Sequence, residues 1–403
     1  MRVMEGFPRT AMGSRWRAGR PFPCGGGRFR GALGVLPAAL ILGSVVSCLS
    51  PLESEADRRA LAPATSNASG LQVGGVELLS PITGIHSLAD TRQWDIFGTD
   101  LGHMFWHGDQ MYMVFGDTFG RNGFGGDNWR SNTMARISTP GAGDRQLRIQ
   151  GMITGPDGKA KELIPSLKKR GREVTVIPTH GISVDGRMHL HYMSVSRWHG
   201  ETGRWDVRHS GIAYSDDDGQ TWAAPQGSVR PGDLGFEQVA LVRSGDHVYT
   251  FGIPQGRFGG VRLGRVIPSR ILEYDAYEYW NGDSWGPELR QAREIVPPAV
   301  GELSVAWNEH HRVWLMMYLN LERGAVVLRT APELVGPWGA EKVVLTAEQF
   351  PGLYAPYIVP MEHLGEEVLF SLSLWGPYNV FLMRMDLTDP PAPAPGPLRH
   401  PVR

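Results

Sequence analysis

Cysteine is almost lacking in this chain of 403 residues, which contains only Cys24 and Cys48. Both lie near the amino terminus, so a domain downstream of them has neither a disulfide nor thiol chemistry. Net charge is lacking as well, because the formal value is -1, and this gives no general electrostatic reason to expect a nucleic-acid partner. We find no long amphipathic helix, no convincing metal-ligand spacing and no feature that requires a cofactor.

Glycine and proline are abundant instead, with 52 and 30 residues. They recur between short apolar runs rather than in one tract, which is typical of many turns joining many strands. Hydrophobic residues make up 41% of the chain, enough for a large core. We therefore expect an all-β protein.

The amino terminus differs in kind from the rest. Residues 1–30 carry many arginines, and residues 31–46 are apolar but too short for a comfortable membrane span. Val-Val-Ser-Cys, which ends at Cys48, resembles a bacterial lipobox. We expect an export signal at 1–48 with Cys48 as a lipidation site, a linker at 49–70, a folded domain at 71–389 and a Pro-rich tail at 390–403. The expected protein is an exported monomer, either secreted or attached to the membrane only through a lipid.

A repeated unit organises the folded part: an apolar strand, a tight polar turn and a second, more strongly apolar strand. The second strands begin at Met111, Met188, Val248, Val313 and Val368, with spacings of 77, 60, 65 and 55 residues. Such spacings suit blades of about four strands. A further strand is expected in each unit, at residues 132–139, 210–222, 270–280, 325–338 and 379–387. Five units predict a five-bladed β-propeller, a ring that leaves few exposed sheet edges.

One turn has a known pattern. Ser215, Asp217, Gly219, Thr221 and Trp222 match S-x-D-x-G-x-T-W, the Asp-box of sialidase-like propellers. We interpret it as structural, with the aspartate binding turn amides and the tryptophan packing beneath.

Acidic residues recur at one position of the unit. Eleven residues before the second strand lie Asp100, Glu237 and Glu302 in three of the five units. The first strand of each blade lines the central channel of a propeller, so acids at equivalent early positions converge. Asp117 ends the hairpin that Asp100 begins, which returns both to one sheet edge. Each acid also has a structural alternative, namely an ion pair with an arginine or a cap on backbone amides.

Such a group of acids suits glycoside cleavage. One carboxyl protonates the leaving oxygen, and a second acts as nucleophile or activates water. Like charges in one partly desolvated place raise the pKa of one member, as an acid catalyst requires. The residues that we expect to bind substrate are Trp94, Arg121, Trp129, Arg130, Asn132, His180, Trp307, Tyr354 and Trp375.

Several motifs resemble one family. TDLG (99–102), FGDTFG (115–120), WRSNT (129–133) and LYAPY (353–357), with further stretches across residues 75–387, are similar to the family catalogued as domain of unknown function 4185. Its members resemble five-bladed furanosidase propellers and include endo-D-arabinanases of glycoside hydrolase family 183, which cut the D-arabinan of mycobacterial arabinogalactan and lipoarabinomannan. The resemblance implies endo-hydrolysis of α-linked D-arabinofuranosides in such a polysaccharide, and it includes Asp100 and Asp117 in the catalytic set.

Two other functions fit the same residues. A carbohydrate-binding propeller without catalysis would hold a glycan with the same acids and aromatic rings. Another furanosidase or a sialidase-like glycosidase is the second alternative. The Asp-box suggests the sialidase, which also needs an arginine cluster and a nucleophilic tyrosine that the sequence does not identify. The mutual placement of Asp100, Asp117, Glu237 and Glu302 discriminates between a catalytic and a structural set.

Overall fold

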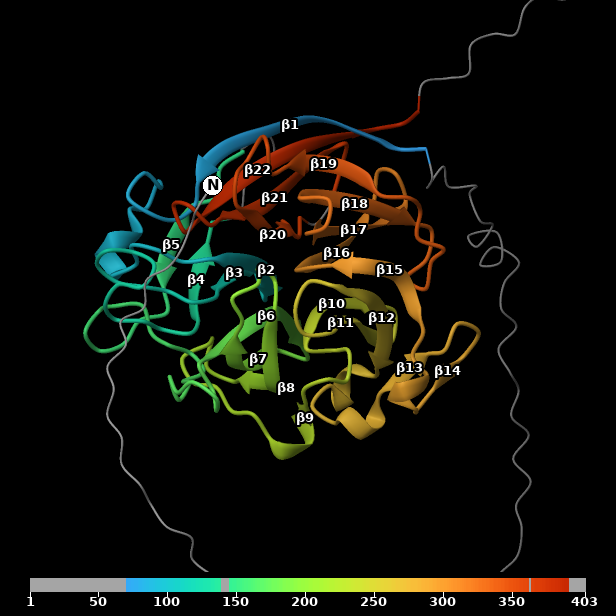
Figure 1. Cartoon of the computed structure of the whole chain (residues 1–403), viewed down its shortest axis with the longest axis horizontal. Helices are drawn as coiled ribbons and strands as arrows, with labels where there is room; N and C mark the ends of the chain where they lie inside the picture. The colour runs from blue at the N-terminus through green and yellow to red at the C-terminus, as the bar shows by residue number, and fades with distance from the viewer. Residues whose placement is uncertain (1–69, 139–144, 362–363, 391–403) are drawn as a thin grey trace, which may run out of the picture. The chain divides into compact units, whose positions relative to one another are not determined.

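The computed structural model describes residues 70–138, 145–361 and 364–390. The expected export signal with Cys48, the linker up to residue 69 and the tail from residue 391 lie outside these ranges. Within the described residues, no helix is long and apolar enough to cross a membrane. Their strands form five sheets in a ring, which confirms the predicted all-β, five-bladed propeller (Figure 1).

Blades 1 to 4 follow one another along the chain, each with its first strand innermost. The strands of blades 1 and 2 are β2 (Leu101–His107), β3 (Gln110–Phe115), β4 (Thr133–Ile137), β5 (Ile149–Met152), β6 (Thr175–Val184), β7 (Arg187–Trp198), β8 (Trp205–Ser215) and β9 (Val229–Pro231). Those of blades 3 and 4 are β10 (Gln238–Ser244), β11 (His247–Ile253), β12 (Gly259–Val266), β13 (Glu278–Trp280), β14 (Trp285–Gly286), β15 (Glu294–Val300), β16 (Leu303–Asn308), β17 (Val313–Asn320), β18 (Ala325–Ala331) and β19 (Lys342–Thr346). Short 3-10 helices are η2 (Thr91–Trp94), η3 (Gln226–Ser228), η4 (Pro268–Arg270), η5 (Tyr274–Ala276) and η6 (Leu289–Gln291).

Blade 5 closes the ring with strands from both ends of the described chain. It contains β20 (Leu353–Ile358), β21 (Glu367–Leu374), β22 (Asn379–Thr388) and β1 (Gln72–Pro81). The outermost strand β1 pairs antiparallel with β22, so the beginning and the end of the propeller share one sheet. Blades 1 and 5 also share a core, in which Met113 and Phe115 belong to one buried cluster with Val380 and Leu382.

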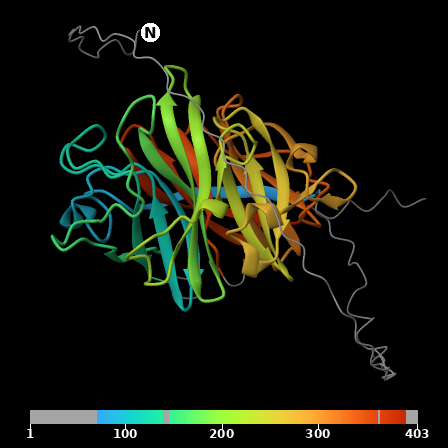
Figure 2. The same cartoon turned by 90° about the horizontal axis from the view of Figure 1, so that it is seen from below.

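The strands run between two faces of the ring (Figure 2). We call the end at which β2, β10, β16 and β20 begin the site face. The far face is the opposite end, where the β2–β3, β10–β11 and β16–β17 turns lie. A residue just before an inner strand therefore lies on the site face, and a residue at the end of that strand lies on the far face.

The predicted second strands are present as β3, β7, β11, β17 and β21, and four of the predicted third strands as β4, β8, β18 and β22. The prediction for residues 270–280 was wrong, because they form η4, η5 and β13, and the third strand of blade 3 is β12. Its sequence GGVRLGRV is typical of a loop. Gly260 is needed because β15 packs closely on β12: a Cβ there would lie 2.6 Å from the carbonyl oxygen of Val296.

The Asp-box turn after β8 has the expected structural contacts. Asp217 accepts hydrogen bonds from the backbone N–H and the hydroxyl of Thr221, both at 2.7 Å. The Trp222 indole donates to the Gly219 carbonyl at 3.0 Å. This turn stabilises the edge of blade 2.

Candidate active site

Asp100 lies on the site face, immediately before β2. The following Leu101 has a positive φ of 65°, and the register of β2 shifts between Leu101 and His103. On the neighbouring blade, Tyr354 at the start of β20 precedes Ala355, whose φ is 50°. The Tyr354 hydroxyl donates a hydrogen bond of 3.1 Å to Asp100 Oδ2. Two inner strands thus adopt left-handed backbone at the positions that aim these two side chains toward each other.

The surroundings of Asp100 favour its protonated form. Burial raises the pKa of this carboxyl to about 8, with repulsion from Asp117 and Glu302 in the same direction. The Tyr378 and Tyr354 hydroxyls act against this rise, because they hydrogen-bond to the carboxyl. Oδ1 of Asp100 is enclosed and accepts no hydrogen bond from the described residues. A proton on Asp100 at neutral pH removes the cost of an incompletely solvated charge.

Asp117 follows β3 and is 8% exposed. Its Oδ1 accepts hydrogen bonds from the Thr175 hydroxyl at 2.5 Å and from the Trp129 indole N–H at 2.8 Å. Burial raises the pKa of Asp117 to about 6, and the two hydrogen bonds and the Lys168 ammonium limit the rise. Because Thr175 begins β6, the carboxyl lies at the junction of blades 1 and 2.

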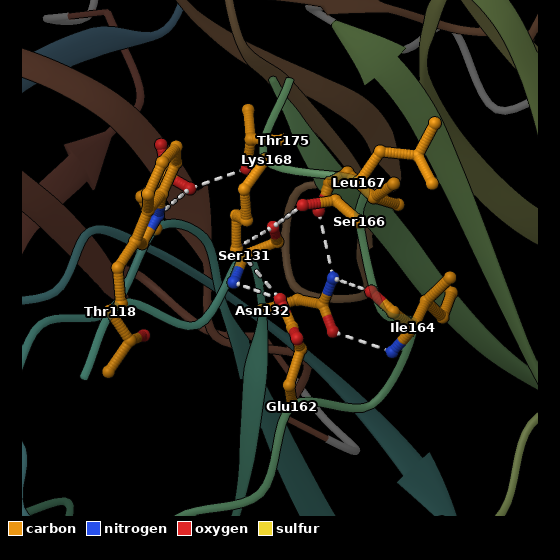
Figure 3. Close-up of polar contacts among 12 residues, drawn as sticks. Thr118, Ser131, Asn132, Glu162, Ile164, Ser166, Leu167, Lys168 and Thr175 are labelled. Carbon is orange, nitrogen blue, oxygen red and sulfur yellow. Dashed lines mark hydrogen bonds and ion pairs between the residues drawn. The ribbon is translucent and has the colours of Figure 1, made fainter. Parts of the chain in front are cut away.

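Lys168 gives this junction its positive charge. Its Nζ lies 4.2 Å from the centre of the Trp129 ring and donates to Glu162 Oε1 at 2.8 Å and to Ser131 Oγ at 2.5 Å (Figure 3). The indole that binds Asp117 is therefore held between the carboxylate and an ammonium group. The pKa of Asp117 depends on a lysine that does not touch it.

Glu302 precedes β16 and is 7% exposed. It forms an ion pair with Arg257, whose Nε and Nη2 both donate to the single oxygen Oε1, at 2.9 and 2.6 Å. The Arg257 guanidinium carbon lies 5.3 Å from the centre of the Tyr354 ring. Oε2 of Glu302 is enclosed and has no hydrogen-bond partner among the described residues. Asp100, Asp117 and Glu302 interact electrostatically, and we call them the carboxylate cluster.

Aromatic rings border the carboxylate cluster. Trp375 and Phe124 are 51% and 54% exposed, and their ring centres lie 4.8 Å apart. The ring centre of Phe119 lies 5.3 Å from that of Phe124, and Phe119 stacks on Trp129 with ring centres 5.9 Å apart. Tyr354, which binds Asp100, lies 6.4 Å from Trp375. Exposed ring faces beside buried carboxyls are suited to an apolar sugar face.

Comparison with known proteins agrees with the motifs. The family model "Domain of unknown function (DUF4185)" matches residues 86–384. The chain belongs to this family. "Notoamide biosynthesis cluster protein J" of Aspergillus sp. (strain MF297-2) is 29% identical over 313 residues, which cover 70% of this chain and 81% of that protein. The crystal structure of a "putative hydrolase" from Bacteroides ovatus ATCC 8483 has a TM-score of 0.53 at 15% identity, over 73% of this chain and 87% of that one. At this identity the likeness shows the fold alone.

In this DUF4185 chain, the fourth predicted acid does not join the cluster. Glu237 is fully buried before β10, and its two oxygens accept backbone N–H groups of Leu234, Gly235 and Gln255 at 2.7 to 3.2 Å. Burial raises its pKa, and the backbone hydrogen bonds limit the rise. Glu237 therefore fixes the turn before β10, as the structural alternative predicts for such an acid.

Three residues predicted to bind substrate make their contacts within the protein. Asn132 is buried, and both ends of its amide are occupied: it donates to the carbonyls of Ile164 and Val176 and accepts from backbone N–H groups of the same segment (Figure 3). Arg130 is buried and donates to the Asp95 carbonyl at 2.6 Å. His180 stacks on His103 with ring centres 5.5 Å apart, and burial lowers its pKa to about 4.

In the part of the chain that the structure describes, three more predicted residues form no hydrogen bond or ion pair with the three carboxyls. Trp94 lies in η2 and packs partly buried against the core of blade 1. Arg121 is exposed in the loop after Asp117, where its carbonyl accepts the Asp127 N–H. Trp307 lies near the end of β16, on the far face, because four residues of strand separate it from Glu302. Of the predicted binding residues, Trp129, Tyr354 and Trp375 lie at the cluster.

Five further residues around the cluster were not predicted: Phe124, Thr175, Lys168, Arg257 and Tyr378. Phe124 lies in the glycine-rich loop after Asp117, and its exposed aromatic ring was a usable signal. Thr175, Lys168 and Arg257 come from other blades or from connections between strands. Their roles depend on the closure of the ring, which no local pattern contains.

Proposed function

We propose that this protein is a glycoside hydrolase that cleaves D-arabinofuranosyl linkages within arabinan. The observation that carries the proposal is the pair Asp100 and Asp117, two coupled and recessed carboxyl groups whose pKa values are raised to about 8 and about 6. Between these values the pair holds one proton, mainly on Asp100. Hydrolysis of a glycosidic bond requires one protonated and one ionised carboxyl at the same time.

The roles follow from the charges. Asp100 donates its proton to the leaving glycosidic oxygen, and the Tyr354 and Tyr378 hydroxyls then stabilise the carboxylate that remains. Asp117, held by Thr175 and Trp129, is the nucleophile or the base that activates water. Glu302 is neutralised by Arg257 and contributes to the field at Asp100. Arg257 positions Glu302 rather than gripping a substrate carboxylate, which argues against a sialidase.

Arabinan as substrate is supported by the motifs and by the border of the cluster. TDLG and FGDTFG contain the two carboxyls and resemble those of endo-D-arabinanases in glycoside hydrolase family 183. Trp375 and Phe124 are exposed rather than enclosing, which suits a chain that continues on both sides of the cleaved bond. The lipidation of Cys48 and the export signal belong to the same proposal, since they would bring the enzyme to a cell-envelope polysaccharide.

The test is incubation of the purified protein with mycobacterial arabinogalactan, followed by chromatography of released oligo-arabinosides. Asp100→Asn and Asp117→Asn are expected to lower the rate by about 10³-fold or more. Asp109→Asn is the matched control, because Asp109 is exposed in the turn of the same hairpin on the far face. Retained binding without any product would instead indicate a carbohydrate-binding propeller.

A further inference from the structure

A groove of about 790 Å³ opens on the far face, between blades 3 and 4. Five of its lining residues are aromatic: Tyr249, Trp280, Trp285, Trp307 and Trp314. Each is partly exposed. The volume is within the usual range of ligand sites, roughly 300–1,000 Å³. Trp307 of the groove lies near the end of the inner strand β16, and Glu302 of the carboxylate cluster lies just before its start. The groove is therefore a different site.

The rings of the groove are held in place by one another. Trp307 lies against Trp314 and Trp280 against Trp285, with ring centres 5.3 Å apart in both pairs. The Trp307 indole N–H also donates to Glu309 at 2.7 Å. Aromatic surface that is fixed before binding loses little conformational entropy when a ligand stacks on it.

Charges of both signs accompany the rings. Arg243 and Glu333 both line the groove, and the Arg265 guanidinium lies 4.2 Å from the centre of the Trp285 ring. Arg265 is itself paired with Glu278. Mixed charge gives no net attraction for an anion or a cation, but it offers both donors and acceptors. Apolar faces bordered by such groups match a neutral ligand that has C–H faces and many hydroxyls.

We propose that the far-face groove is a second glycan-binding site, which holds a neutral polysaccharide chain without cleaving it. The inference rests on the proposed function, since the glycan is taken to be the arabinan that the carboxylate cluster cuts. Binding at one face keeps the enzyme on the polymer while the other face engages a neighbouring segment. Two linked sites raise the affinity for a polymer above that for a short oligosaccharide.

The test is native electrophoresis in gels that contain soluble arabinan, with Asp100→Asn as the parent protein so that no cleavage occurs during the run. Adding Trp307→Ala is expected to weaken the binding constant from retardation about fivefold or more, the loss of a stacked ring. Trp198→Ala, which removes an exposed indole outside the groove, is the matched control. Glu333→Ala is a second groove variant, at an exposed position whose truncation does not threaten folding.

Equal retardation of the parent and both groove variants would overturn the inference, as would a parent that arabinan does not retard. Cleavage of arabinan by the unmodified protein is measured separately. Cleavage without any effect of Trp307→Ala or Glu333→Ala would leave the hydrolase proposal standing and remove the second site. Weakened retardation without cleavage would establish the far-face site and reject the hydrolase.

Discussion

The Tyr354 hydroxyl donates a 3.1 Å hydrogen bond to Asp100 across the junction of the last blade and the first. The two residues are 254 positions apart in the chain. They meet because β1 joins β22 and closes the ring. The candidate acid catalyst is therefore assembled by the same event that completes the propeller, and its proton affinity depends on a tyrosine from the other end of the fold.

Removing that hydroxyl tests the relationship. In Tyr354→Phe, Asp100 loses a hydrogen bond that stabilises its ionised form, so its pKa rises further above about 8. The alkaline limb of kcat/KM against pH is expected to move up by about 0.5–1 pH unit, since one such bond contributes about 1 kcal/mol. An unchanged or lower alkaline limb would show that Tyr354 does not act on the proton of Asp100.

Lys168 is expected to set the position of the acidic limb of kcat/KM against pH. Its ammonium lowers the pKa of Asp117, so Lys168→Met should raise that pKa and move the acidic limb of kcat/KM to higher pH. The neighbouring Lys169 is exposed, and Lys169→Met is the matched control. Equal shifts in the two variants would mean that general surface charge, not the contact over Trp129, sets the limb.

Asp100 is expected to cost stability at alkaline pH. An unfolded aspartate ionises near pH ~4, whereas the folded chain keeps the Asp100 proton to about pH 8. The stability that this proton contributes is present at low pH and is lost as pH rises through 8. Asp100→Asn should therefore raise the free energy of unfolding by about 5 kcal/mol at pH 9 and by about 1 kcal/mol at pH 5. Urea unfolding at both pH values measures this, and a variant less stable at pH 9 would contradict it.

The stacked histidines predict the opposite pH dependence. Burial lowers the pKa of His180 to about 4, so between about pH 6.5 and 4 the unfolded chain binds a proton that the folded chain excludes. Stability should fall by about 3 kcal/mol over this window because of His180. His180→Phe should flatten the slope, while His86→Gln, at an exposed position, should keep it. Equal slopes in all three proteins would contradict the prediction.

Much of the fold could be predicted because each blade repeats the same local signals. The number of blades could be predicted from the strongly apolar second strands, each of which follows a polar turn. The Asp-box turn could be predicted because the residues that form its hydrogen bonds lie within one short motif. The glycine-rich β12 could not be recognised, since Gly260 and Gly264 allow the close approach of β15 and of Tyr279 in β13, and both strands come later in the chain. The closing strand β1 has no repeat partner and was missed for the same reason.

The candidate site was predictable where the position of a residue relative to its strand determines the face of the ring on which it lies. Asp100 and Glu302 both precede inner strands that run the same way, and Asp117 returns to the same face because it follows β3, which is antiparallel to β2. Glu237 has the equivalent position before β10, but its carboxyl accepts backbone N–H groups of the preceding turn. The conformation of that turn keeps it out of the cluster. Trp307 could not be assigned to a face without the length of β16. Arg257 was missed because its partner Glu302 comes from the next blade.

The most direct measurement is the rate of arabinan cleavage by the unmodified protein between pH 5 and 9, with Asp100→Asn and Asp117→Asn alongside. A bell-shaped kcat/KM with limbs near the values of the pair, about 6 for Asp117 and about 8 for Asp100, is the expected result. Both variants should lose activity at every pH. Arabinan left intact throughout this range, or cleaved equally well by both variants, would contradict a hydrolase that works through these two carboxyls.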